Sequence, residues 1–308
     1  MGKEIRGQGQ RETMLEECDV MDLIRKRTSC RTYDGEPIGA AARHKLETFL
    51  DSECRAPFGS RARLALIAAT EDDQTMVRRL GTYGFIKGAT AYIGGAVLDS
   101  GNAGALEDFG YAVERAVLYA TSLGLGTVWL GGTFTKSRFE RAMGLRSGES
   151  LPAVIALGNA AESARASDAV IRRGAQADRR LAWEQLFYEA PTEGRGLFET
   201  ALSRQSAGMY ETALDMVRIG PSASNKQPWR IVRNGESWHF YMQRSRRYRS
   251  RNSLVRVADM QRIDMGIALC HFELAALQLG LAGQWVSEDP GLPLPGPLTS
   301  YVTTWVPG

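Results

Sequence analysis

The sequence is poor in the residues that build metal centres, disulfide frameworks and catalytic triads. Its 308 residues include four cysteines and three histidines, and none of them shows the spacing of a metal site or a redox motif. No apolar run is long enough to cross a bilayer. The net charge of +3 is too small to favour nucleic acid. We therefore expect a protein of the reducing cytoplasm, without a membrane or nucleic-acid partner.

The remaining composition is that of a globular protein, with 44% hydrophobic and 24% charged residues. Helical patterns alternate with short strand patterns, which is typical of an α+β fold. Residues 1–18 are polar, lack the apolar core of a signal peptide and predict a flexible leader. The densest basic run, residues 244–251, is interpreted as a solvated loop or, alternatively, as a surface for an acidic partner.

Residues 220–230, GPSASNKQPWR, combine short polar side chains with a large aromatic residue. Gly220 and Pro221 end a helical pattern, and Trp229 begins a strand pattern. The serine, asparagine and glutamine side chains between them can hydrogen-bond to nearby backbone or to a ligand. The segment therefore predicts a binding loop, although a polar helix-to-strand connection without a ligand is the alternative.

A second candidate segment follows a predicted helix that begins after Asp19. Arg27 and Arg31 bracket the hydroxyls of Thr28 and Ser29. Guanidinium forks beside short hydroxyl donors suit a phosphate group. The alternative is an ordinary basic helix end, in which arginine complements the helix dipole.

Both segments resemble motifs of the nitroreductase family of FMN-dependent oxidoreductases. Residues 221–229 match its P-S-x-x-N-x-Q-P-W signature, and residues 27–38 match its R-x-S-x-R-x-F/Y-x-x-x-P-I motif. Thr28 departs from the basic residue or histidine that is usual in the family. The chain is similar to TM1586-type nitroreductases over roughly residues 20–308. The resemblance implies a nitroreductase-like α+β fold and an FMN enzyme that takes hydride from NADH or NADPH and reduces a small electron acceptor, such as a nitro compound or a quinone.

The resemblance also implies which residues bind FMN. No side chain is expected to be catalytic, because the flavin carries the chemistry. The glycines around position 131 would bring a backbone N–H close to flavin N5. Lys87 either reaches the cofactor or is an ordinary surface lysine. The implied cofactor-binding residues are Arg27, Thr28, Ser29, Arg31, Lys87, Leu130, Gly131, Gly132, Arg179, Arg180, Pro221, Ser222, Ala223, Asn225 and Gln227.

The chain also contains an internal repeat. Residues 266–286 align without a gap on residues 110–130, with a shared G-x-A entry and a shared G-L-x-x-x-W exit. We interpret this as a duplication with an offset of 156 and assign residues 19–190 and 191–308 to the two halves. The first half keeps R-x-S-x-R and the second keeps P-S-x-x-N. We therefore expect a single-chain pseudo-dimer, monomeric in solution, with one complete FMN site at the interface of the halves and one degenerate site.

Other functions remain open on the sequence alone. A flavin-binding or storage protein, or a degenerate scaffold, would keep the motifs without turnover. An oxygen-dependent flavin enzyme would need an occluded substrate pocket, which a sequence does not reveal.

Overall fold

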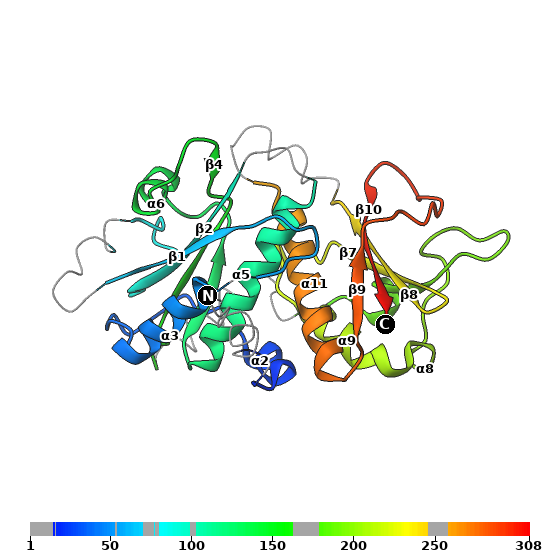
Figure 1. Ribbon diagram of the computed structural model, residues 1–308, viewed down its shortest axis with the longest axis horizontal. Coiled ribbons are helices and arrows are strands. Elements are labelled where there is room, and N and C mark those ends of the chain that lie inside the picture. Colours follow the sequence, from blue (N-terminus) through cyan, green and yellow to red (C-terminus); the bar gives the residue numbers. More distant parts are fainter. Residues whose placement is uncertain are drawn as a thin grey trace, which may run out of the picture. The chain divides into compact units, whose positions relative to one another are not determined.

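The computed structural model describes residues 15, 17–52, 54–69, 77, 80–98, 103–162, 179–245 and 258–308. The chain forms two compact units, each with its own sheet (Figure 1). Unit 1 comprises residues 1–56, 61–102 and 112–174, and unit 2 comprises residues 57–60, 103–111 and 175–308. Among the described residues, no helix is both long and apolar enough to cross a membrane.

The sheet of unit 1 is antiparallel throughout, in the order β1-β2-β5-β3, with the short β4 paired to the end of β2. Ile93 on β2 lies opposite Leu66 on one side and Ile155 on the other. The central strands are apolar, and β5 is buried along its whole length, so this sheet forms the core of the unit. The strands are β1 (Arg63–Ala68), β2 (Ala91–Leu98), β3 (Gly126–Leu130), β4 (Glu149–Ser150) and β5 (Val154–Gly158).

Helices complete unit 1. Asp19 caps the first of them as predicted, because its side chain accepts a hydrogen bond of 3.0 Å from the N–H of Asp22. The ring of Phe49 on the second helix stacks on Tyr119 of α5, with centroids 4.3 Å apart. The helices are α2 (Val20–Lys26), α3 (Ala40–Leu50), α5 (Ala105–Ser122), whose first seven residues belong to unit 2, and α6 (Lys136–Ala142).

The sheet of unit 2 has the order β6-β7-β8-β10-β9. Its pairs are antiparallel except for β6, which runs parallel to β7. The strands are β6 (Phe187–Glu189), β7 (Trp229–Asn234), β8 (Ser237–Gln243), β9 (Gly283–Val286) and β10 (Thr299–Pro307). The helical elements are η1 (Trp183–Gln185), α8 (Arg204–Ala207), η2 (Gly208–Tyr210), α9 (Glu211–Arg218), η3 (Ala223–Asn225) and α11 (Met260–Gln278).

An aromatic cluster fills the core of unit 2 around Phe272 of α11. The Phe272 ring meets Phe240 edge-on at 5.2 Å and Trp305 at 5.8 Å, and it stacks parallel to Tyr210 at 5.7 Å. Phe272, Phe240 and Trp305 have no solvent exposure. Edge-to-face and offset arrangements of this kind are favourable, so the cluster fixes α11 against the sheet.

The two sheets share one topology. The order β1-β2-β5-β3 in unit 1 corresponds to β7-β8-β10-β9 in unit 2, and every corresponding pair is antiparallel. Strand β6 is the addition in unit 2, at the free edge of β7. The agreement in strand order supports the duplication that the sequence indicates.

The helices α5 and α11 end in the same turn. The N–H of Leu125 bonds to the carbonyl of Ala120 at 3.0 Å, and the N–H of Leu281 bonds to that of Ala276 at 2.9 Å. In each turn the preceding glycine is left-handed, with φ of +79° and +75°. This is the Schellman cap, which needs glycine at that position. Because donors, acceptors and glycines are all 156 residues apart, the ungapped alignment holds atom for atom here.

The shared G-x-A entry also has a structural role. A Cβ added to Gly110 would overlap the carbonyl oxygen of Ile263, and a Cβ added to Gly266 would overlap that of Glu107. Residues 107 and 263 are themselves related by the offset of 156, so the two contacts are equivalent. Reciprocal contacts between equivalent positions are the mark of a two-fold relation. Here they bring the start of α5 and α11 together within unit 2.

The two compact units do not contain the same residue ranges as the two predicted halves. Residues 57–60 and 103–111 pack in unit 2, and β6, which the sequence places in the first half, joins the sheet of unit 2. The boundary at residue 190 stays a prediction about the duplication. Residues 1–14 of the predicted leader and residues 246–251 of the basic run lie outside the described residues.

Candidate functional site

The predicted cofactor-binding residues fall into two sets, one in each unit. The set in unit 1 is Arg27, Thr28, Ser29, Arg31, Lys87, Leu130, Gly131 and Gly132. The set in unit 2 is Arg179, Arg180, Pro221, Ser222, Ala223, Asn225 and Gln227.

In unit 1, backbone pairing brings three parts of its set together. The N–H of Cys30 donates to the carbonyl of Thr127 at the start of β3, at 2.9 Å. On the same segment, the N–H of Lys87 donates to the carbonyl of Arg31, also at 2.9 Å. Residues 29–33 therefore lie beside both β3 and the loop that carries Lys87. The Lys87 side chain is exposed, which fits either of its two predicted roles.

Arg27 provides a buried positive charge at the end of α2. The residue is 8% exposed, and its Nε lies 4.0 Å from a carboxylate oxygen of Glu114 on α5. Glu114 is fully buried and accepts a hydrogen bond of 2.8 Å from the indole N–H of Trp129. Burial lowers the pKa of Arg27 and Glu114 opposes that shift, so the guanidinium stays charged. Among the described residues, the Nε of Arg27 has no hydrogen-bond acceptor.

In unit 2, the structure brings Arg180 and Asn225 into direct contact. One Nη of Arg180 donates to the side-chain oxygen of Asn225 at 3.1 Å, and the other donates to the carbonyl of Ile219 at 3.0 Å. The amide of Asn225 donates to the carbonyl of Arg179 at 2.7 Å. The 221–227 loop and residues 179–180 are therefore one hydrogen-bonded assembly.

Gln227 is the central residue of this assembly. It is 2% exposed, and its side-chain oxygen accepts a hydrogen bond of 2.8 Å from the N–H of Leu181. Its amide nitrogen donates to the carbonyls of Asn225 and Arg179, and its backbone N–H donates to the hydroxyl of Ser222. Gln227 and Asn225 therefore hold the loop itself. The sequence argument expected such groups to bond to nearby backbone or to a ligand. The structure shows partners within the chain, and the ligand contact stays a prediction.

The same loop has an unusual backbone. Ser224, Asn225 and Gln227 have φ values of +51°, +53° and +47°. Left-handed backbone is uncommon for residues other than glycine, and it concentrates where the surrounding structure forces a functional shape. The hydrogen bonds of Gln227 and Arg180 supply that constraint here.

Comparison with known proteins places the chain in a family. The family model described as "Putative TM nitroreductase" matches residues 19–276. The chain belongs to this nitroreductase family. No curated protein matches the sequence.

Solved structures agree with this at the level of the fold. A "putative nitroreductase" of Thermotoga maritima MSB8 is 14% identical, with a TM-score of 0.54, and covers 99% of this chain and 98% of its own. A nitroreductase family protein of Clostridium difficile 630 is 21% identical, with a TM-score of 0.37, over 46% of this chain and 84% of its own. The family model and the Thermotoga maritima structure together show the α+β nitroreductase-like fold. Membership of the family supports a general oxidoreductase role.

This nitroreductase family member also contains a loop anchor that sequence reasoning missed. Asp264 of α11 is 1% exposed, and one of its carboxylate oxygens accepts the N–H of Ala223 at 2.9 Å. Its other oxygen has no hydrogen-bond partner among the described residues. Burial raises the pKa of Asp264 well above its usual range, despite the hydrogen bond from Ala223.

Asp108 is the counterpart of Asp264, since the two are 156 residues apart. It is 1% exposed, and its two oxygens accept the N–H groups of Phe58 at 2.9 Å and Ser60 at 2.6 Å. Burial raises its pKa to about 6. The D-x-G sequence that precedes both G-x-A entries was the available signal, two residues before the start of the alignment.

The loop that Asp108 holds is the one that has lost the family signature. Residues 57–60 keep the proline of that signature and lack its serine and asparagine. The ring of Phe58, at the position of the missing serine, packs so tightly on Gly104 that a Cβ there would overlap it. An aspartate anchor is therefore present at both related positions, whereas the polar side chains of the signature occur only in the second loop.

Proposed function

We propose that the chain is an FMN-dependent oxidoreductase, which takes hydride from NADH or NADPH and reduces a small electron acceptor such as a nitro compound or a quinone. Family membership and the two retained motifs support this proposal. The observation that carries it is the buried Arg27, whose Nε has no hydrogen-bond acceptor among the described residues.

The donor set of unit 1 fits a phosphate group. A buried guanidinium with unused N–H donors is costly unless an anion pairs with it. The Glu114 carboxylate lies 4.0 Å from the Nε of Arg27 and leaves that buried N–H without a hydrogen-bond acceptor among the described residues. Arg31 and Lys87 add positive charge on neighbouring backbone. In the proposal, these residues and Ser29 hold the phosphate and ribityl chain, while the backbone at Gly131 approaches the flavin ring.

The unit 2 set fits a positioning role. Ser222 accepts one hydrogen bond through its oxygen, so its O–H proton is available to a ligand. The left-handed backbone of Ser224, Asn225 and Gln227 and the bonds of Gln227 keep the loop in one shape. Bound FMN would supply the redox chemistry, and the residues of the chain would bind it, orient it and exclude water from it.

The first test is the visible spectrum of the purified protein with quantified flavin release. We expect a yellow protein with about one FMN per chain, because each retained motif occurs once. Oxidation of NADH or NADPH with menadione or a nitroaromatic acceptor then tests turnover. A protein that stays colourless with added FMN would contradict the proposal. A yellow protein without turnover would instead indicate flavin storage.

The second test is the Arg27→Lys variant. Lysine keeps the charge that faces Glu114 but loses the planar fork that binds phosphate oxygens. A hydrogen bond to a charged group is worth about 1.5–3 kcal/mol, so the dissociation constant of FMN should rise roughly 10- to 100-fold. Flavin fluorescence titration measures it. Arg25→Lys is the matched control, since Arg25 is exposed on the same helix.

An unchanged FMN affinity in Arg27→Lys, with Arg25→Lys also unchanged, would show that Arg27 does not contact the phosphate. The assignment of phosphate binding to residues 27–31 would then be wrong, although the chain could still bind flavin elsewhere. Thermal unfolding without FMN separates this result from misfolding of the variant.

A further inference from the structure

The outer edge of β1, in the sheet of unit 1, has no paired strand among the described residues. Strand β1 lies at the end of the order β1-β2-β5-β3 and bonds to β2 on one side (Figure 1). At the opposite end of this sheet the edge of β3 is covered, because Ser29 forms a bridge with Thr127 and the N–H of Cys30 donates to the Thr127 carbonyl. An open edge presents N–H and C=O groups with which another strand can pair.

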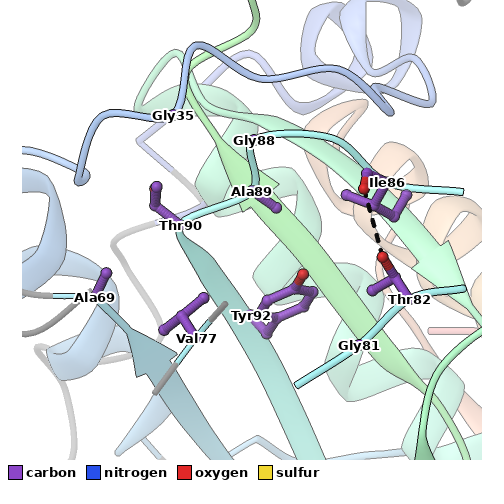
Figure 2. Close-up of a pocket in the computed structure, with 10 residues that line it drawn as sticks. All are labelled: Gly35, Ala69, Val77, Gly81, Thr82, Ile86, Gly88, Ala89, Thr90 and Tyr92. Atoms are coloured by element: carbon purple, nitrogen blue, oxygen red, sulfur yellow. Dashed lines mark hydrogen bonds between the residues drawn. The ribbon is translucent and has the colours of Figure 1, made fainter. Parts of the chain in front are cut away.

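The register of β1 shows which of its backbone groups face outward. The N–H of Ala69, just beyond β1, donates to the carbonyl of Thr90 at 2.8 Å, and Figure 2 shows the two residues at the same end of β1 and β2. Hydrogen-bonded pairs alternate along an antiparallel ladder, so every second residue back from Ala69 bonds to β2. The residues between them turn their N–H and C=O groups to the outer edge. They are Leu64, Leu66 and Ala68.

In unit 2 the corresponding edge is occupied by a strand. The shared strand order makes β7 the counterpart of β1, and β6 lies parallel to β7 on its outer side. The N–H of Ile231 donates to the carbonyl of Leu186 at 2.9 Å, and the carbonyl of Arg233 accepts the N–H of Ala190 at 2.7 Å. The outward backbone groups of β7 therefore hold β6.

The outward residues of β1 match those of β7 position by position. From the aligned Trp129 and Trp285, the residues directly opposite can be followed from strand to strand across each sheet. In unit 1 they are Ile155, Ile93 and Leu66. In unit 2 they are Trp305, Trp238 and Arg233. Leu66 thus corresponds to Arg233, and the residues two positions earlier correspond as well, so the open groups of β1 are those that bind a strand in unit 2.

The sequence of β1 also lacks the usual protection of an edge strand. From Leu64 to Ala68 it contains no charged residue, proline or glycine. Natural proteins place such residues on exposed edges to prevent pairing with other chains. The side chains of Leu64 and Leu66 are only half-buried, so an added strand would cover them further.

We propose that the outer edge of β1 binds an extended, apolar peptide segment of a partner protein, which joins the sheet as a parallel strand in the way that β6 joins β7. Backbone hydrogen bonds supply the affinity in this kind of recognition, and alternate side chains supply the specificity. Strand β6 indicates the chemistry of the segment, because its Phe187 and Tyr188 are buried on opposite faces of the sheet.

The parallel sense of β6 favours a partner segment over a second copy of this chain. Two copies related by a two-fold axis would pair β1 with β1 in the antiparallel sense. The proposal is independent of the flavin, since the outward groups belong to β1 and not to the predicted cofactor-binding residues. It can therefore be tested in flavin-free and flavin-loaded protein alike.

The experiment uses β6 itself as the probe. A fluorescein-labelled peptide of residues 184–190, EQLFYEA, is titrated with the full-length protein, and fluorescence anisotropy reports binding. Leu186 and Ala190 bond to β7, so the N–H of Tyr188 between them faces the same way, whereas that of Phe187 faces away. We expect saturable binding that N-methylation at Tyr188 weakens roughly tenfold, because a hydrogen bond is lost and the methyl group separates the strands. N-methylation at Phe187 is the matched control and should leave binding unchanged.

Leu66→Pro tests the location of the site. The N–H of Leu66 faces outward, so proline removes a donor for the added strand and no hydrogen bond to β2. We expect a folded variant, judged by its thermal unfolding, that binds the peptide roughly tenfold more weakly. Undiminished binding to a folded Leu66→Pro protein would place the peptide elsewhere and contradict the proposal, as would a failure of the peptide to bind the unmodified protein.

Amide hydrogen exchange of the unmodified protein, followed by NMR, does not depend on any variant. The N–H of Leu66 should exchange faster than that of Ile67, which bonds to β2, and the peptide should slow the exchange of Leu66 alone. Slow exchange of Leu66 in the free monomer would show that the edge is already covered. Self-association that Leu66→Pro abolishes, measured by sedimentation, would make a second copy the occupant. Either result would overturn the proposal.

Discussion

Asp108 and Asp264 show how a single buried side chain can set the shape of a loop. Each lies on a long helix and accepts backbone N–H groups from a loop that begins with the family's proline. A carboxylate that takes such bonds keeps the loop in place without a side chain of the loop taking part. Residues 57–60, which lack the serine of the signature, are held in this way.

The raised pKa of Asp108 predicts a specific pH dependence of stability. In the unfolded chain the carboxyl ionises near 3.8, whereas in the folded protein it keeps its proton up to about pH 6. Its contribution to stability is therefore complete below pH 4 and is lost as pH rises through 6. The shift corresponds to a fall of about 3 kcal/mol in the free energy of unfolding. Denaturant unfolding between pH 4 and pH 7 measures it.

Asp108→Asn removes this titration, so the difference in stability between the unmodified protein and the variant should shrink as pH rises from 4 to 6. The amide also leaves one N–H of the loop without an acceptor, which lowers stability at every pH. Asp51→Asn, at an exposed aspartate, is the control and should follow the unmodified protein. If the stability difference between the unmodified protein and Asp108→Asn stayed constant from pH 4 to pH 7, the raised pKa of Asp108 would be wrong.

The sequence identified most polar residues of the second loop, and their roles toward a cofactor stay predictions. Asn225 and Gln227 were predicted as cofactor contacts, and the structure shows both bonded to residues 179–181. Asp264 was missed because its partner, Ala223, is 41 residues away in the chain. Hydrogen bonds over such separations depend on how helices and loops pack, and that information is spread over the whole chain.

Among the helices and strands, the reciprocal contacts of Gly110 and Gly266 give the sharpest prediction. In Gly266→Ala the added methyl group would overlap the backbone at Glu107 and Tyr111. Backbone atoms cannot rotate away, so the helices must separate. We expect a loss of about 3 kcal/mol, the upper end for overpacking, although alanine in a helix would otherwise gain about 1 kcal/mol over glycine.

Gly110→Ala should destabilise the protein to a similar extent, because it makes the equivalent contact with Ile263. Gly39→Ala is the control, since nothing lies within 4 Å of its added Cβ. Chemical denaturation of the three variants measures the changes. If the Gly266 and Gly110 variants lost no more stability than Gly39→Ala, the close approach of α5 and α11 would be wrong.

Local sequence patterns predicted several elements well. Asp19 indicated the start of α2, and the shared G-L exit indicated the caps of α5 and α11. The place of β6 was not predictable in the same way. Its three residues pair with β7 more than 40 positions later, and a short apolar run does not reveal its partner. Strand pairing depends on contacts between residues far apart in the chain. Only the structure therefore shows that β6 belongs to unit 2.

For the molecule as a whole, two sheets of the same strand order support a duplicated origin more strongly than the aligned helices alone. Amphipathic helices resemble one another by chance, whereas four strands in the same order and sense rarely coincide. The two predicted halves are unequal in their motifs. The R-x-S-x-R motif is present only in the first and the P-S-x-x-N motif only in the second, so neither copy contains both predicted parts of a flavin site.

This division predicts the assembly state of the flavin-loaded protein. Because one chain contains both motifs, we expect a monomer that binds one FMN without a second copy. Sedimentation equilibrium of the yellow protein, followed by flavin quantification, measures mass and ratio on the same sample. A flavin site shared by two chains would lose FMN when dilution separates the chains. A site within one chain should not show this loss. A dimer that loses its flavin on dissociation would contradict the single-chain proposal, and a ratio near two per chain would show that the copy with Phe58 still binds flavin.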